Sequence, residues 1–284
     1  MLIMKRISLL ILTALILGSS ALTAMAQERK EDFTPKRGDF GISVMASPLT
    51  ELTNAFKGTA YTPMQPTVTI SGKYMVTDHG ALFLNLGWLY RNSNDTYYTR
   101  DDAAYAVDPF TMDKVTDAVR ANTSGGNFSF GFEGRVGMGR AQGVFGIGAM
   151  YAFSYYDSRY TYGNAITAVN QVPSTAFNGI NGTSVPGVSY QRYLRQFSGA
   201  PTHTAGLLAY AGIEWFVAPK VSLGARVNLI AAYSWTNATY YVAEGYNTMT
   251  AQVEEWTELL SPSSGAIDFG TENIGADLSI NVYF

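Results

Sequence analysis

Apolar and polar residues alternate strictly through the last eleven residues of the chain, Ile274–Phe284. A period of two residues predicts a β-strand with one apolar and one polar face. A soluble sandwich strand can show the same pattern, but eleven residues is also about the length that a tilted strand needs to cross a bilayer. The apolar face would carry Ile274, Ala276, Leu278, Ile280, Val282 and Phe284.

The same alternation recurs seven times upstream, which predicts an all-β chain. With the last segment, these strands predict an eight-stranded antiparallel up-and-down transmembrane β-barrel over residues 38–284. The upstream segments are Asp39–Ala46, Thr67–Thr77, Ala81–Arg91, Asn127–Met138, Val144–Tyr156, Thr204–Val217 and Val221–Trp235.

The connections between these segments alternate in length. Three are short, near Asp78, Gly139 and Pro219. Four are long, at residues 47–66, 92–126, 157–203 and 236–266. An even number of strands with this alternation is typical of outer-membrane barrels, so we expect short periplasmic turns and long extracellular loops.

The N-terminus has the composition of an export signal. Lys5 and Arg6 precede the apolar run Ile7–Leu17, and an Ala-Met-Ala sequence ends at Ala26. This predicts a cleaved signal peptide at residues 1–26, followed by a flexible periplasmic leader at residues 27–37. A membrane anchor is the alternative, but the apolar run is shorter than the ~20 residues of a spanning helix.

Composition and charge exclude several classes of protein. The chain has no cysteine, so disulfides, thiolate metal sites and cysteine nucleophiles are absent. Removal of the predicted signal takes the 19 basic residues to 17 against 22 acidic ones, a net charge of −5. That balance does not favour nucleic acid as a partner. No motif predicts a cofactor, and acidic loop residues such as Asp101 and Asp102 fit no known calcium-binding spacing.

The pattern resembles the small eight-stranded outer-membrane barrels of Gram-negative bacteria, the family that includes OmpX and the transmembrane part of OmpA. The resemblance covers nearly all of the mature chain, as a pattern and without a residue motif. It implies that the C-terminal strand is an assembly signal read by the barrel-assembly machinery. The residues that match this signal are Leu278, Ile280, Val282, Tyr283 and Phe284. No peptidoglycan-binding domain follows, so the cell-wall tether of OmpA is not implied.

Six charged residues are expected on the inward faces of the strands. Eight strands enclose a space just wide enough for side chains, so each charge there needs a partner. Glu214, Arg226 and Asp277 lie on consecutive strands and predict a ladder of ion pairs. We interpret the set as structural filling, with a gated or narrow conducting path as the alternative. This lumen charge network comprises Lys73, Glu133, Arg135, Glu214, Arg226 and Asp277.

Two of the long loops contain patterned segments. Asn247–Leu260 has apolar residues at helical spacing before Pro262, which predicts a helix whose apolar face packs on the rim, the lumen mouth, another loop or a partner. Val188–Phe197 combines aromatic and arginine residues, as in strand arms above a membrane or a loop that caps the barrel. The predicted helix face comprises Met249, Val253, Trp256 and Leu260.

The sequence therefore predicts a monomeric, non-enzymatic protein embedded in outer-membrane lipid. Its role is structural, or an interaction of its loops with an extracellular protein or surface ligand. A small passive channel is the alternative. A remoter alternative is a hydrolase at the outer rim, because His203 is expected near Ser154 and Asp157.

Overall fold

The computed structural model describes residues 33–46, 68–137, 139–178, 180–181 and 185–284. These residues form a 12-stranded antiparallel sheet and one short helix, α3 (Asp102–Val107). The predicted signal peptide, most of the predicted leader and the predicted loop at residues 47–66 lie outside the described residues. The strands are β1 (Phe40–Ala46), β2 (Val68–Thr77), β3 (Gly80–Arg100), β4 (Lys114–Val136), β5 (Ala141–Thr161), β6 (Ile180–Asn181), β7 (Tyr190–Ser198), β8 (Thr202–Ala218), β9 (Val221–Thr236), β10 (Thr239–Asn247), β11 (Gln252–Ser261) and β12 (Ser264–Tyr283).

Among the described residues, the strand pairings include a cycle. The order β1–β2–β3–β4–β5–β8–β9–β12 is antiparallel throughout, and β12 pairs with β1 again. Val44 of β1, for example, lies opposite Ile70 of β2 and Ile280 of β12. Each of the seven upstream segments that alternate in the sequence coincides with part of one of these strands, which the two-residue period explains.

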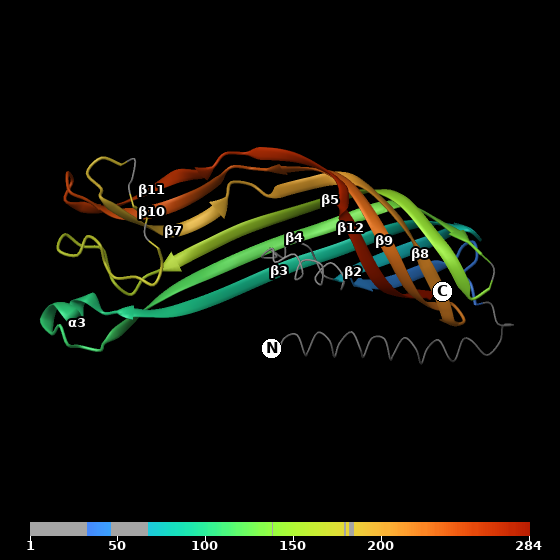
Figure 1. The fold of residues 1–284 in the computed structure, drawn as a ribbon, viewed down its shortest axis with the longest axis horizontal. Helices are drawn as coiled ribbons and strands as arrows, with labels where there is room; N and C mark the ends of the chain where they lie inside the picture. The colour runs from blue at the N-terminus through green and yellow to red at the C-terminus, as the bar shows by residue number, and fades with distance from the viewer. Residues whose placement is uncertain (1–32, 47–67, 138, 179, 182–184) are drawn as a thin grey trace.

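The sheet branches at β5. Residues Ala141–Ser154 pair with β8, whereas Asp157–Arg159 pair with β7. Beyond the branch, β7 pairs with β10 and β10 with β11. Figure 1 shows β2, β8 and β9 at one end of an elongated molecule and α3, β7, β10 and β11 toward the other.

We call this second end the distal lobe. It comprises Tyr90–Arg100 of β3, α3, Lys114–Ser124 of β4, Tyr155–Thr161 of β5, the described part of residues 162–189, and the strands β7, β10 and β11. The run from Trp88 to Arg100 in β3 is about 40 Å long at ~3.3 Å per residue. The far end of the lobe, at Arg100, is therefore remote from the strands of the cycle.

Three expectations about the loops are wrong. Residues 157–203 and 236–266 are not loops throughout, because β6, β7, β10 and β11 form within them and bring the sheet to 12 strands. The predicted loop 92–126 consists mainly of the continuations of β3 and β4, joined by α3. The predicted helix Asn247–Leu260 is a β-hairpin, in which Val253 lies opposite Tyr246 and Trp256 opposite Ala243.

The hairpin forms because β10 offers a complete antiparallel partner to residues that also happen to show helical spacing. Ala251 adopts a φ of 55° in the connection between β10 and β11. Met249 lies in this connection and is exposed, Val253 and Leu260 are also exposed, and Trp256 is half-buried. These four residues therefore form no common buried face.

Phe33–Arg37, the described end of the predicted flexible leader, packs against the end of the molecule opposite the lobe. Phe33 lies against a buried cluster of Met75, Ala81, Phe216 and Tyr283. The guanidinium of Arg140 stacks 3.8 Å from the Phe33 ring centroid. The described part of the leader thus covers this end of the sheet cycle.

Burial is inverted along the strands of the cycle. The outward side chains of Leu82, Leu84 and Leu86 are 46–53% exposed, whereas the neighbouring inward side chains are buried. The buried polar and charged residues of the cycle include Ser43, Ser71, Lys73, Asn85, Ser129, Glu133, Arg135, Gln142, Glu214, Ser222, Asn228, Asp277 and Asn281. The polar side of the sheet faces its own interior.

Candidate functional site: the interior ion pairs and the distal lobe

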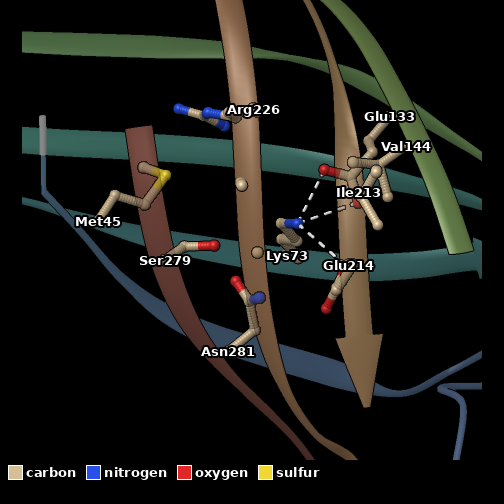
Figure 2. A pocket seen from close by; sticks show the side chains of 11 residues that line it. Met45, Lys73, Glu133, Val144, Ile213, Glu214, Arg226, Ser279 and Asn281 are labelled. Carbon is tan, nitrogen blue, oxygen red and sulfur yellow. Dashed lines mark hydrogen bonds and ion pairs between the residues drawn. The ribbon is translucent and has the colours of Figure 1, made fainter. Parts of the chain in front are cut away.

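Four charged side chains meet inside the sheet cycle in one compact cluster. Lys73 Nζ lies 2.8 Å from Glu133 Oε2 and 4.0 Å from Glu214 Oε2. Arg135 Nη2 lies 3.0 Å from Glu133 Oε1 and 2.7 Å from Glu214 Oε2. We call these four residues the interior ion cluster. Figure 2 shows the Lys73 ammonium pointing toward the Glu133 and Glu214 carboxylates.

The cluster draws its members from three different strands. Lys73 comes from β2, Glu133 and Arg135 from β4, and Glu214 from β8. Glu133 and Arg135 are two residues apart, so the pleat directs both side chains to the same face. All four are buried, and two positive charges face two negative ones. Pairing offsets the cost of several kcal/mol for each desolvated charge.

Two tyrosines complete the hydrogen bonding of the carboxylates. Tyr210 Oη donates to Glu133 Oε2 at 2.7 Å, and Tyr283 Oη donates to Glu214 Oε1 at 2.8 Å. Arg135 also donates to Tyr283, and Ser222 donates to Glu214.

A glycine lies directly opposite each of these tyrosines on the neighbouring strand. Gly146 faces Tyr210 and Gly41 faces Tyr283. A Cβ atom would come within 2.3 Å of the Tyr210 ring at Gly146 and within 2.6 Å of the Tyr283 ring at Gly41. The glycines therefore provide the space that lets each ring lie flat and reach its carboxylate. Sequence reasoning missed the role of Tyr210, although the small inward residues of β5 were a signal for a large neighbour.

The other two members of the predicted lumen charge network form a separate pair. Arg226 Nε donates to Asp277 Oδ2 at 3.0 Å, and the two residues are directly opposite each other on β9 and β12. Asn228 Nδ2 donates to the same oxygen at 2.6 Å. The Arg226 guanidinium lies 4.6 Å from the Tyr210 ring centroid. Glu214 is held instead by Arg135, so the expected ladder from Glu214 through Arg226 to Asp277 is divided.

A small cavity remains beside the interior ion cluster. Its volume is about 20 Å³, which is room for about one water molecule. Figure 2 shows Lys73, Glu133, Arg226 and Asn281 among its lining residues.

The residues of the predicted assembly signal lie on both faces of β12. Leu278, Ile280 and Phe284 are exposed on the outer face, and Val282 is half-buried there. Tyr283 points inward and is fully buried against Phe216. Recognition by the assembly machinery stays a prediction, but Tyr283 also holds the interior ion cluster.

The residues of the predicted rim hydrolase do not form a catalytic triad. His203 Nδ1 is 2.6 Å from Tyr151 Oη, and its ring stacks on Trp235 with centroids 5.2 Å apart. Asp157 Oδ1 accepts from Arg195 Nε at 2.6 Å. Ser154 pairs with Thr202 in the sheet. His203 is therefore part of an aromatic row, and Asp157 anchors the point where the sheet branches.

The distal lobe has a folded interior of its own. The rings of Tyr97, Tyr160 and Tyr162 each lie edge-on to Phe177, with centroids 5.3–5.9 Å apart. Tyr193 packs in the same way against Tyr241 at 5.2 Å. Such edge-to-face pairs each contribute roughly 0.5–1.5 kcal/mol beyond simple burial. The third predicted long loop thus packs onto the strand arms through its aromatic residues.

Two buried polar groups fix the loop after β5 to the lobe. Asp117 is fully buried and accepts from Gly163 N at 2.9 Å, Thr175 Oγ1 at 2.6 Å and Ala176 N at 2.9 Å. Arg192 pairs with Glu244 at 2.7 Å and stacks over Tyr162. The lobe is therefore held by specific polar contacts as well as by ring packing.

Asp102, at the start of α3, also accepts hydrogen bonds from the loop after β5. Its Oδ2 accepts from Ser174 N at 2.6 Å and from Asn170 Nδ2 at 2.9 Å. Partial burial acts to raise the pKa of Asp102, but the hydrogen bonds from Asn170 and Ser174 outweigh it and lower the pKa below its ordinary value. The charged form of Asp102 is therefore the form that binds the loop.

The described residues contain neither a metal centre nor a spanning helix. No group of three or more histidine, aspartate or glutamate residues there is arranged to hold a metal ion. In the same part of the chain, no helix has the length and apolar character needed to cross a membrane.

No protein-family model matches the chain, and no curated protein matches it. The chain aligns over most of its length with solved structures of outer membrane proteins, at low TM-scores. The outer membrane protein OprG from Pseudomonas aeruginosa has a TM-score of 0.35 and 12% identity, over 89% of this chain and 99% of that one. A major outer membrane protein from Thermus thermophilus has a TM-score of 0.34 and 10% identity, over 87% and 99%.

The third is Ail, the attachment invasion locus protein of Yersinia pestis, with a TM-score of 0.31 and 8% identity, over 87% of this chain and 98% of that one. At these TM-scores and identities, the similarity assigns no function to this chain.

Replacement of Arg135 by Met should lower the free energy of unfolding by roughly 3 to 5 kcal/mol, because it leaves Glu133 and Glu214 buried with only Lys73. The additional change Glu214→Gln should recover much of the loss. Arg91→Met, at an exposed position of β3, is the control and should change stability little. Urea unfolding in detergent micelles measures all three variants. A double variant as unstable as Arg135→Met alone would contradict the pairing argument.

Acid should release the loop from Asp102. Because the folded-state pKa is lowered, this contact stabilises the lobe above the ordinary pKa and is lost as pH falls through the folded-state value. Amide hydrogen exchange at Ser174, corrected for the intrinsic rate, should therefore become faster as the pH falls below the ordinary pKa of an aspartate. Asp102→Asn should exchange fast already at neutral pH. An identical acid response in Asp102→Asn would show that another group controls the loop.

Proposed function

We propose that the chain is an eight-stranded β-barrel of the bacterial outer membrane whose interior is closed and whose distal lobe is extracellular, with a structural or surface-interaction role. The observation that carries this proposal is the inverted burial of the strand cycle. A protein dissolved in water buries leucine and exposes lysine and glutamate. Here Leu82, Leu84 and Leu86 face outward, while Lys73 and Glu133 are buried.

Inverted burial is favourable when the surrounding solvent is hydrocarbon. In a bilayer every backbone polar group must pair within the protein, and a closed antiparallel cycle achieves this with strands. Lipid-facing and interior residues then alternate along each strand. The pairing of β12 with β1 supplies the closure in this proposal.

A row of aromatic residues supports one membrane boundary. Through successive cross-strand pairs, Trp88 and Phe153 lie in one register with His203 and Trp235. Tyr233 stacks on Trp235 with ring centroids 5.8 Å apart. Aromatic girdles of this kind lie at the interface between lipid and water. Distal to this row, the strands carry the lobe into the external medium.

The closed interior favours a structural or interaction role over a small passive channel. The interior ion cluster spans the space between β2, β4 and β8, and the adjoining cavity holds about one water molecule. The tyrosines Tyr210 and Tyr283 add two further side chains to the same layer. A folded lobe with its own buried contacts is then the part of the molecule that can meet a partner.

The membrane orientation can be tested by cysteine labelling, because the natural chain has no cysteine. On intact Gram-negative cells, a membrane-impermeant maleimide should label Val169→Cys, at a fully exposed lobe position. His79→Cys, in the turn at the opposite end, is the matched control and should react only after lysis. Labelling of His79→Cys alone on intact cells would reverse the proposed orientation, and reaction of neither variant in a membrane fraction would exclude it.

Planar-bilayer recordings test the closed interior. The purified protein should give no steady conductance, whereas Arg135→Ala should give a small one because it removes the largest side chain from the ion cluster. Heat-modifiable gel mobility shows whether each sample is folded, and Arg91→Ala is the control. A steady conductance of the unmodified protein would favour the small passive channel instead.

A further inference from the structure

The end of the β3–β4 hairpin exposes large apolar side chains to an unusual extent. We call the segment Asp101–Asp113 the tip; it contains α3. Val107 is 88% exposed, Phe110 91% and Met112 89%. The tip lies about 40 Å along β3 from the level of Trp88, at ~3.3 Å per residue. It is therefore remote from the lipid that would surround the barrel.

The backbone of the tip is well ordered by its own hydrogen bonds. Asp101 caps α3 by accepting from Ala103 N at 2.9 Å and Ala104 N at 3.1 Å, and Asp101 N donates to Asp113 O at 3.1 Å across the base. Asp108 accepts from Phe110 N at 2.9 Å through its side chain.

Two further bonds fix the turn that carries the exposed side chains. Thr111 N donates to Asp108 O at 3.0 Å, and Asp113 N donates to Thr111 Oγ1 at 3.2 Å. Pro109 restricts φ between Asp108 and Phe110. A segment that is ordered before binding loses little conformational entropy when a partner covers it.

The base of the tip is also attached to the rest of the lobe. Asp102 N donates to Asn164 Oδ1 at 3.0 Å, and Arg100 Nη2 donates to Ser174 Oγ at 3.0 Å. The exposed side chains are therefore carried by a segment that is hydrogen-bonded to the rest of the lobe. Exposed apolar side chains on a rigid support are typical of binding anchors.

The charge of the tip indicates which kind of partner would bind it. Asp101–Asp113 contains four aspartates and no lysine or arginine. Arg100 and Lys114 flank the tip, and Arg100 pairs with Asp102 at 3.1 Å, so Asp108 and Asp113 are the carboxylates nearest to the exposed side chains in sequence. Asp108 and Asp113 are within three residues of Phe110 in sequence. A partner that buries Phe110 must therefore bring positive charge to the surroundings of an apolar pocket.

We propose that the tip is a preformed docking element, in which Phe110 and Met112 enter an apolar pocket with a cationic rim on an extracellular protein. The inference deepens the proposed surface-interaction role and rests on it. A second copy of the tip is a poor partner because its aspartates repel. An anionic lipid surface repels the tip for the same reason, and a neutral one would have to desolvate the aspartates.

A displayed library of small folded domains, with one randomised concave surface, tests this inference. The library is selected on the full-length protein in lipid nanodiscs. We expect most selected domains to combine lysine or arginine with apolar residues, to bind more weakly in high salt, and to lose at least tenfold in affinity for Phe110→Ser. The matched control is Met249→Ser, because Met249 is a 75%-exposed apolar residue in the connection between β10 and β11, outside the tip.

Domains that bind Phe110→Ser and the unmodified protein equally would overturn the inference, as would a selection dominated by acidic surfaces. A triple variant, Val107→Ser with Phe110→Ser and Met112→Ser, is incubated with neutral and anionic vesicles beside the unmodified protein. Vesicle binding that only the unmodified protein shows would replace the protein partner by a membrane. Gel mobility confirms that the variants are folded.

Failure of this inference is distinguishable from failure of the proposed function. If Val169→Cys is labelled on intact cells but binding does not depend on Phe110, the lobe is extracellular and the tip is not its docking element. If Val169→Cys is not labelled on intact cells or in membranes, the proposed function itself fails.

Discussion

The structure depends most on the need to pair charge in a confined interior. Glu133 and Glu214 are almost completely buried, and each lies between Lys73 and Arg135. None of the four could remain there alone, because a desolvated charge costs several kcal/mol. The cluster ties β2, β4 and β8 together across the interior. It thereby sets how these strands face one another across the interior.

The same requirement explains why small and large residues face each other across the sheet. Tyr210 reaches Glu133 only because Gly146 leaves room for its ring, and Tyr283 reaches Glu214 over Gly41. Tyr283 also belongs to the apolar cluster that Phe33 covers. Tyr283 thus links the interior ion cluster to the apolar cluster that Phe33 covers.

The distal lobe forms because β3, β4 and β5 extend beyond the part of the sheet that forms the cycle. Where β5 leaves β8 it pairs with β7, and Asp157 holds Arg195 at that branch. From there, Asp117, Arg192 and a group of aromatic rings fold the remaining chain into a compact unit. A stable lobe of this kind can present a rigid tip, whereas a mobile loop would lose entropy on binding.

The sequence by itself determined the eight strands of the cycle, their inward and outward faces and the residues that carry interior charge, because a period of two is a local property. Of the predicted ladder it determined the Arg226–Asp277 pair but not the partner of Glu214, which is held by Arg135 from another strand. It also misassigned Asn247–Leu260, where helical spacing coexists with a strand that only β10 stabilises. The partner of a side chain or a strand is a long-range choice, and only the tertiary structure decided it.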